Sequence, residues 1–212
     1  MMKRKLITSE SEWLHSRGIG GTLASAIIGA NAYLSPNDAY NYLVYGESQN
    51  VSNEAIERGK MLEPSIRILW NYFNKNYKVE EPPKENWLFY DDEFPFLTAS
   101  FDGILTDENG NKGILEIKTR QGSTLEWENG MIPKQYYVQC LHYLIVSGYD
   151  YVNICCLVLN DDENLRFIQR RIERKDHIEE IEKLKKVEIN FYNKCKEKIR
   201  PKRIIEFPIV AT

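Results

Sequence analysis

The chain has 212 residues, of which 42% are apolar and 12% aromatic, and its formal net charge is −3. This length and apolar content are enough for one domain with a full core. No stretch approaches the roughly 18 apolar residues of a membrane span, and residues 1–5 are not followed by the apolar core of a signal peptide. We therefore expect a soluble, cytoplasmic protein with no membrane partner, and the charge argues against one that coats nucleic acid by bulk attraction.

A glycine-rich run, RGIGGT at residues 17–22, stands near the start of the chain. Glycines let backbone amides approach a ligand closely, Thr22 can cap a small-residue helix over 23–28, and Arg17 adds a positive charge. The run indicates either a phosphate clamp or a tight connection. A second helix is predicted from Ser35 as the cap to about Val44, with Pro36 in its first turn.

A long helix is predicted over residues 53–74. Its expected buried stripe is Ile56, Leu62, Ile66, Leu69, Trp70 and Phe73. Pro64 should interrupt or kink the helix, because its ring removes one amide donor and crowds a carbonyl. Glu63 falls on the inward side, where a carboxylate needs a partner. That partner is either a shared metal ion or a basic side chain in a buried ion pair.

The central stretch of the chain predicts a β-hairpin that carries charged groups. Asp102 follows an apolar run where the chain bends, residues 107–113 (DENGNKG) form a polar turn, and a strand follows at once. Glu116 and Lys118 are two residues apart on that strand and therefore point to the same face.

These residue types suit a divalent cation held against a phosphodiester. Magnesium prefers one or two carboxylates with water and phosphate completing its shell, so Asp102 and Glu116 fit, and the carbonyl of Ile117 adds a third oxygen. Lys118 would then lie near the attacking water or the scissile phosphate. The alternative is a surface hairpin with a Glu/Lys ion pair worth less than about 1 kcal/mol.

The second half of the chain completes the predicted architecture. Strands are expected at residues 77–82, 87–90, 151–159 and 165–172, and helices at 133–147 and 174–199. Gln139 and His142 recur at helical spacing; Gln139 could donate to a phosphate, whereas His142 is expected to pack or to be solvated. The order of elements predicts an α/β (α+β) fold with a central mixed β-sheet flanked by helices.

Cysteine and charge distribution add two weaker expectations. The four cysteines show no CxxC spacing, so we expect buried free thiols rather than a metal or iron-sulfur site. Residues 166–203 hold half of the 28 lysines and arginines, which indicates either a basic face or solvated helical lysines.

Five blocks in order carry a family resemblance. They are residues 17–22 (RGIGGT), 59–64 (GKMLEP), 99–103 (ASFDG), 115–119 (LEIKT) and 137–139 (YVQ). Together they resemble the YqaJ-type phage recombination exonucleases, which belong with phage lambda exonuclease in the PD-(D/E)xK nuclease superfamily. The resemblance covers about residues 10–160 of what we expect to be a single nuclease domain, 1–212, with a C-terminal helix at 174–200.

The resemblance implies a restriction-endonuclease-like core and a Mg2+-dependent exonuclease, with Mn2+ as an alternative ion. Such an enzyme loads on a double-stranded DNA end and digests one strand from 5′ to 3′ in homologous recombination. It would work in the bacterial host cell, encoded by a phage or prophage. Relatives form ring-shaped trimers, and the remaining 3′ strand would feed a single-strand annealing protein.

The resemblance also implies roles for individual residues. Asp102 and Glu116 would be metal ligands, Glu63 a further metal-site carboxylate and Lys118 the catalytic lysine. The groups expected to bind the terminal 5′ phosphate or the neighbouring backbone are Arg17, Thr22, Ser100 and Gln139.

The chain departs from the family pattern at several positions. Phe101 stands in place of the usual proline, Thr22 in place of serine and Leu141 in place of a second glutamine, and aligning Arg17 requires a one-residue gap. Two other functions remain open: a structure- or site-specific endonuclease on the same fold, and a non-catalytic DNA-end-binding relative.

Overall fold

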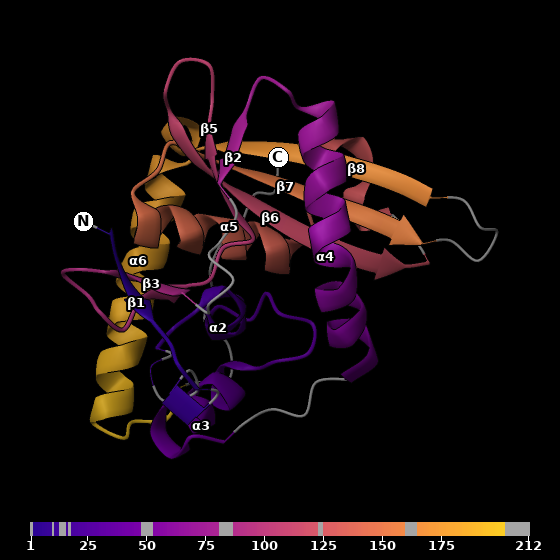
Figure 1. Ribbon diagram of the computed structural model, residues 1–212. Helices are drawn as coiled ribbons and strands as arrows, with labels where there is room; N and C mark the ends of the chain where they lie inside the picture. Colours follow the sequence, from indigo (N-terminus) through magenta and orange to yellow (C-terminus); the bar gives the residue numbers. More distant parts are fainter. Residues whose placement is uncertain are drawn as a thin grey trace.

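The computed structural model describes residues 2–9, 11, 12, 16, 18–47, 53–80, 87–122, 125–159 and 165–201. A five-stranded sheet lies at its centre, with strand order β2-β5-β6-β7-β8 (Figure 1). The strands are β2 (Lys78–Glu80), β5 (Gly103–Thr106), β6 (Lys112–Gln121), β7 (Tyr151–Leu159) and β8 (Leu165–Glu173). β6 and β7 pair in parallel and the other neighbours pair antiparallel. The predicted mixed sheet is therefore confirmed.

The β5–β6 hairpin forms where the polar turn predicts it. The Asp107 carboxylate accepts hydrogen bonds from the backbone amides of Asn109 and Asn111, and Gly110 takes the positive φ of 83° that the turn requires. The pairing of β5 with β6 ends at Leu115, opposite Gly103. β6 continues for six residues beyond Leu115, to Gln121, and this extension carries the charged groups.

Helices cover both faces of the central sheet. α4 (Asn53–Phe73) lies across one face, and α5 (Lys134–Ser147) lies behind the other (Figure 1). α2 (Gly21–Ile27), α3 (Pro36–Tyr45) and α6 (Ile178–Lys196) complete the layer on the α5 side. Short 3-10 turns, η1 (Leu125–Gly130) and η2 (Arg174–Asp176), precede α5 and α6. None of the helices in the described ranges is both long and apolar enough to cross a membrane.

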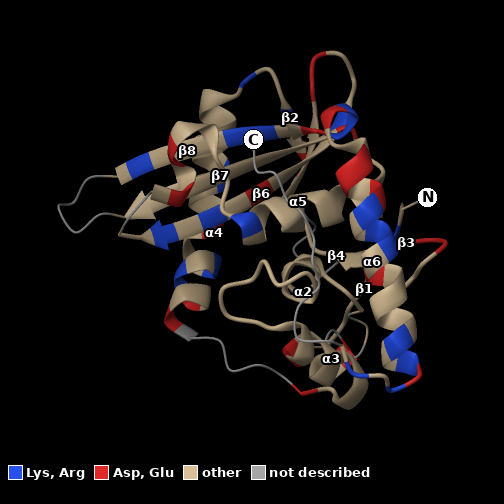
Figure 2. Cartoon of the chain, turned by 180° about the vertical axis from the view of Figure 1, so that it is seen from behind, with Lys and Arg blue, Asp and Glu red and all other residues tan. Residues whose placement is uncertain are grey.

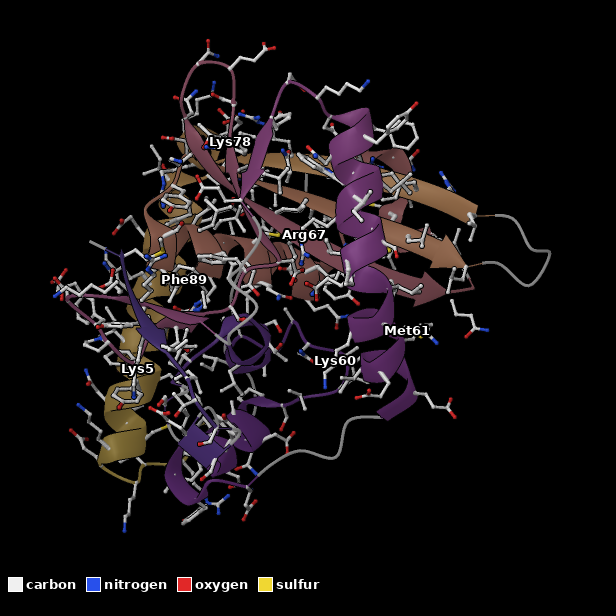
Figure 3. The ribbon with its side chains drawn as sticks, viewed as in Figure 1. Lys5, Lys60, Met61, Arg67, Lys78 and Phe89 are labelled. Carbon is white, nitrogen blue, oxygen red and sulfur yellow. The ribbon has the colours of Figure 1, made fainter. Side chains whose placement is uncertain are left out.

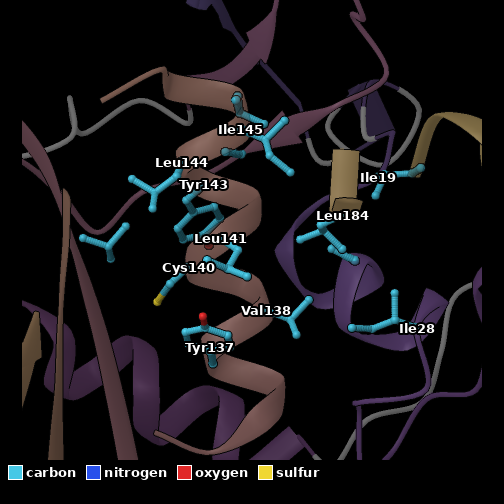
Figure 4. Close-up of a cluster of buried hydrophobic side chains, with 14 of the residues drawn as sticks. Ile19, Ile28, Tyr137, Val138, Cys140, Leu141, Tyr143, Leu144, Ile145 and Leu184 are labelled. Atoms are coloured by element: carbon cyan, nitrogen blue, oxygen red, sulfur yellow. The ribbon is translucent and has the colours of Figure 1, made fainter. Parts of the chain in front are cut away.

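Strand alternation divides the core into two clusters. On β7, Val152, Ile154 and Cys156 face the larger cluster, which is built around α5 and reaches Leu184 of α6 and Ile28 after α2 (Figure 4). Tyr151, Cys155 and Leu157 of the same strand face a smaller cluster under α4. Its other members are Ile66, Trp70, Leu105, Leu115 and Ile117. All four cysteines are buried free thiols, as predicted.

A second, three-stranded sheet was not predicted as a unit. It consists of β1 (Met2–Leu6), β3 (Trp87–Asp91) and β4 (Thr98–Ala99), all antiparallel in the order β1-β3-β4. The strands expected at 77–82 and 87–90 therefore separate: β2 joins the central sheet and β3 joins this one.

The long helix corrects two details of the prediction. α4 runs through Pro64 without interruption. Ile66 and Trp70 are buried as expected, whereas Ile56 and Phe73 are exposed. The first turns of α4, which carry Ile56, extend past the sheet that the middle turns cover (Figure 1). Phe73, in the last turn, lies over the edge strand β8, with its ring 6.3 Å from that of Phe167.

The C-terminal helix begins later than residue 174. Arg174 instead donates hydrogen bonds to the carbonyls of Tyr149 and Leu144, and it thereby satisfies acceptors at the end of α5. α6 begins at Ile178. The predicted ends of α3 and α5 hold, with Gly46 and Gly148 as left-handed C-caps.

Candidate active site

A cavity of about 910 Å³ lies along the part of β6 beyond its pairing with β5, between α4 and α5. Seven of the predicted site residues line it, namely Glu63, Ser100, Asp102, Glu116, Ile117, Lys118 and Gln139. Thr22 is not among its lining residues, and Arg17 lies outside the described residues. The cavity therefore gathers side chains from α4, the β4–β5 turn, β6 and α5.

β6 presents its carboxylate and ammonium side by side. Lys118 Nζ lies 2.5 Å from Glu116 Oε1, as expected for residues two apart on one strand. Gln139 of α5 donates from Nε2 to the same Glu116 oxygen at 2.8 Å. The other oxygen, Oε2, is buried and has no hydrogen-bond partner within the described part of the chain. Glu116 therefore keeps one acceptor unused beside the cavity.

Asp102 is fixed by the turn that enters β5. Its Oδ2 accepts a hydrogen bond from the backbone amide of Ile117 at 2.6 Å. Arg67 of α4 donates from Nε to the Asp102 carbonyl at 2.7 Å. Because the amide and carbonyl of one strand residue point to the same side, the carbonyl of Ile117 also points toward Asp102.

The electrostatics of the site reflect three neighbouring carboxyl groups, those of Glu63, Asp102 and Glu116. Burial raises the pKa of Asp102 well above its ordinary value, and the neighbouring carboxylates of Glu116 and Glu63 raise it further. Burial also raises the pKa of Glu116, although Lys118 partly offsets this. Burial alone would lower the pKa of Lys118, but Glu116 and Asp102 outweigh it and the pKa rises. Lys118 therefore stays protonated beside Glu116 and Asp102.

Arg67 is a site residue that the sequence analysis missed. It is buried, forms an ion pair with Glu63 one helical turn earlier, and holds the Asp102 carbonyl. Figure 3 shows Arg67 and Lys60 on the side of α4 that faces the rest of the molecule, with Met61 on the outer side. Glu63 therefore has the ion pair that was one of its two expected partners, and it also lines the cavity. The spacing of four residues between Glu63 and Arg67 was the available signal.

The donor set fits a divalent cation with an incomplete protein shell. Over the described ranges, no group of three or more His, Cys, Asp or Glu side chains is arranged to hold a metal ion. Magnesium needs only one or two carboxylates, with water and phosphate supplying the remaining oxygens. The unpartnered Glu116 oxygen and the raised carboxyl pKa values of Asp102 and Glu116 are what a site prepared for added positive charge would show.

The glycine-rich run is explained by close packing. A Cβ at Gly18 would lie 1.9 Å from the Phe96 carbonyl oxygen, and one at Gly21 would lie 2.4 Å from Gln139 Cγ. Ile19 exchanges backbone hydrogen bonds with the strand region around Leu97, through Phe96 O at 2.6 Å and Thr98 N at 2.9 Å. The tight connection, one of the two expectations, is therefore present.

Thr22 does not cap a helix, contrary to prediction. α2 begins at Gly21 with Gly20 as its N-cap, so Thr22 lies within the first turn, where it is exposed. The small side chains allow the helix to begin two residues before the predicted start.

Side chains of α5 position the charged groups of β6. Gln139 directs Nε2 to both Glu116 and the Tyr143 hydroxyl, and Tyr143 donates to the Ser100 carbonyl at 3.1 Å. Lys118 Nζ lies 4.9 Å from the centre of the Tyr136 ring. His142 lies elsewhere, fully buried against Glu188, so the expectation that it packs is correct.

Comparisons with known proteins identify a matching family and a curated relative. The family described as YqaJ-like viral recombinase domain matches residues 12–150. The YqaJ protein of Bacillus subtilis (strain 168) is 33% identical over 195 residues, which cover 87% of this chain and 56% of the relative. The chain therefore spans about half the length of that curated relative.

Solved structures share the fold. The alkaline exonuclease LHK-Exo from Laribacter hongkongensis has a TM-score of 0.67 at 20% identity, covering 89% of this chain and 94% of its own. Its complex with dAMP has a TM-score of 0.68 at 21% identity with the same coverage. A phage related exonuclease from Haemophilus somnus 129PT has a TM-score of 0.57 at 15% identity, covering 88% and 98%.

Proposed function

This chain belongs to the family of YqaJ-like viral recombinase domains, and from that premise we propose that it is a metal-dependent deoxyribonuclease. Its substrate would be linear double-stranded DNA, digested from the end in the 5′ to 3′ direction during phage-type homologous recombination. The observation that carries the proposal is the meeting of Asp102, Glu116 and Lys118 in one cavity. Two relatives of the same fold are exonucleases by name, and one of them binds dAMP, a deoxynucleoside monophosphate.

The metal would be Mg2+, with Mn2+ as an alternative. Asp102 and Glu116 would hold it, with the carbonyl of Ile117 and the carboxylate of Glu63 at the same site. When bound, such an ion lowers the pKa of water and neutralises phosphate charge.

Lys118 would act as a donor rather than as a base. Without a metal ion, Glu116 and Asp102 raise its pKa, so Lys118 carries its proton when a strand arrives. Its ammonium would stabilise the negative charge that develops on the phosphate oxygens as water attacks phosphorus. Gln139 and Tyr136 would keep Glu116 and Lys118 in place.

DNA contacts are proposed on the same basis. Ser100 is exposed at the cavity, so it could meet the terminal phosphate or the neighbouring backbone. Gln139 also lines the cavity, but Nε2 already donates to Glu116 and to Tyr143, so Gln139 would have to release one of these bonds to donate to a phosphate. Arg17 and Thr22 are proposed for this role from the family resemblance. The same resemblance suggests a homo-oligomer, a trimeric ring, and delivery of the 3′ strand to an annealing protein. The mass of the protein in solution, measured by light scattering, tests the ring.

One assay tests the activity. A 5′-phosphorylated linear duplex, the nicked circle and the closed circle are incubated with Mg2+, with Mn2+ and with chelator. We expect release of mononucleotides from the linear duplex only, and only with metal. Cleavage of the closed circle would instead indicate an endonuclease. Binding without digestion in either metal would indicate a non-catalytic DNA-end-binding protein.

A further inference from the structure

A second cavity, of about 500 Å³, lies beside the first. Neighbouring residues of β6 and of α5 line the first and the second cavity. On β6, Lys118 lines the first cavity and Arg120 the second; on α5, Tyr136 lines the first and Gln135 the second. The two cavities are therefore consecutive along one surface.

Arg120 continues the charged row of β6. Glu116, Lys118 and Arg120 are separated by two residues each, so they share one face of the strand, with about 6.6 Å between successive backbone positions. Figure 2 shows acidic and then basic residues in succession toward the carboxyl end of β6. This spacing is comparable with the distance between successive phosphates of a nucleic-acid strand.

The guanidinium of Arg120 is only partly engaged. Its Nη1 donates to Glu126 Oε2 at 2.5 Å, whereas Nε is buried and has no acceptor among the residues that the structure describes. Glu126 is exposed, so its carboxylate can turn toward solvent. Lys134, also exposed, adds a second cation to the lining. An arriving phosphate would therefore meet two cations and displace or share one carboxylate.

The rest of the cavity suits a nucleoside. Tyr33 is 77% exposed, and it lines the space together with the apolar side chains of Met131 and Ile132. An exposed aromatic ring beside a basic groove is the arrangement that stacks bases of single-stranded nucleic acid with little sequence preference.

We propose that this second cavity binds the nucleotide adjacent to the one under attack. Arg120 and Lys134 would hold its phosphate, and Tyr33 would stack on its base. Glu126 would stay paired with Arg120 until the DNA strand binds. This inference rests on the proposed function, because it assigns the next position of the same DNA strand.

Binding measurements test the proposal. The probe is a 5′-phosphorylated duplex whose terminal phosphorothioate linkages resist hydrolysis. Its binding is measured by fluorescence anisotropy at several salt concentrations. For Arg120→Ala we expect about fivefold or greater loss of affinity and a decrease of about 0.7–0.9 in the slope of log K against log salt. Arg120→Lys should keep the slope. Glu126→Gln should bind more tightly than the parent, and because Glu126 is exposed this variant should fold normally.

Matched variants separate the outcomes. Lys183→Ala removes an exposed charge on α6, which lines neither cavity, and it should behave as the parent. Tyr33→Ala should lose about fivefold or more in affinity, and Tyr33→Phe should restore it. A parent that binds and digests DNA while Arg120→Ala matches Lys183→Ala in affinity and slope overturns the second cavity alone. A parent that neither binds nor digests linear duplex overturns the proposed function, and this inference with it.

Discussion

α5 separates two buried acid–base pairs that resemble each other in chemistry and differ in surroundings. On one side, Lys118 and Glu116 are 2.5 Å apart, with side chains 19% and 3% exposed. On the other side, His142 and Glu188 are 2.9 Å apart and both 0% exposed. In each pair the carboxylate keeps one oxygen without a partner among the described residues.

The surroundings decide what each pair can do. The first pair faces a large cavity and has the carboxyl group of Asp102 nearby, whose pKa is raised by burial and by Glu116 and Glu63. The second is closed between α5 and α6, and His142 Nε2 donates to the Thr98 carbonyl of β4 at 2.8 Å. In this protein the candidate for reactivity is therefore the pair that faces a cavity and a further carboxyl group, and not the closed pair. The comparison predicts that the first pair controls turnover and the second controls stability.

The largest expected effect is on turnover. Lys118→Ala should reduce digestion of linear duplex by about 10²–10³-fold, because it removes a donor to developing charge. DNA-end binding should stay largely intact, as measured by anisotropy, and Lys183→Ala should digest as fast as the parent. Equal digestion rates for Lys118→Ala and the parent would remove Lys118 from the mechanism.

The second expected effect is on stability. His142→Ala leaves Glu188 buried without its partner, and breaking such a pair costs about 3–5 kcal/mol of unfolding free energy. Urea denaturation measures this loss. Replacing both residues with leucine should recover most of it, because apolar packing can substitute for a buried pair. A single variant as stable as the parent would show that the pair does not hold α5 against α6.

The smallest effect concerns pH. Burial alone would lower the pKa of His142, but Glu188 and the Thr98 carbonyl outweigh it and raise the pKa above the ordinary value of 6.5. The folded protein thus keeps this proton to a higher pH than the unfolded chain does. Its contribution to stability is complete below pH 6.5 and declines as pH rises through the folded pKa, by at most about 1.4 kcal/mol per pH unit.

Unfolding measurements between about pH 6 and 7.5 test this decline, because this range lies below the ordinary cysteine pKa of about 8.5. The double leucine variant should lack this component of the pH dependence. A parent whose stability is constant across the range would contradict the assignment of a protonated His142.

The sequence allowed much of the architecture to be predicted, because local patterns determined it. The apolar run at 151–159 predicts β7, and the helical pattern that ends at Gly148 predicts α5. Asp102, Glu116 and Lys118 line one cavity, as expected. Alternation along β6 alone was enough to place Glu116 beside Lys118.

Features set by distant contacts could not be predicted. β1 pairs with β3, more than 80 residues away, and periodicity carries no information about such a partner. The exposure of Ile56 and Phe73 depends on where the sheet beneath α4 ends. The glycine-rich run indicates either a phosphate clamp or a tight connection, and only the structure shows that the neighbours requiring Gly18 and Gly21 are Phe96 and Gln139.

The parallel pairing of β6 with β7 has a consequence for synthesis of the protein. β6 gains this neighbour only after α5 has been made, since the crossover helix lies between the two strands. A nascent chain that stops before Tyr151 therefore contains Asp102, Glu116 and Lys118 but lacks the strand that pairs with β6. The geometry of the candidate active site therefore depends on translation having passed β7.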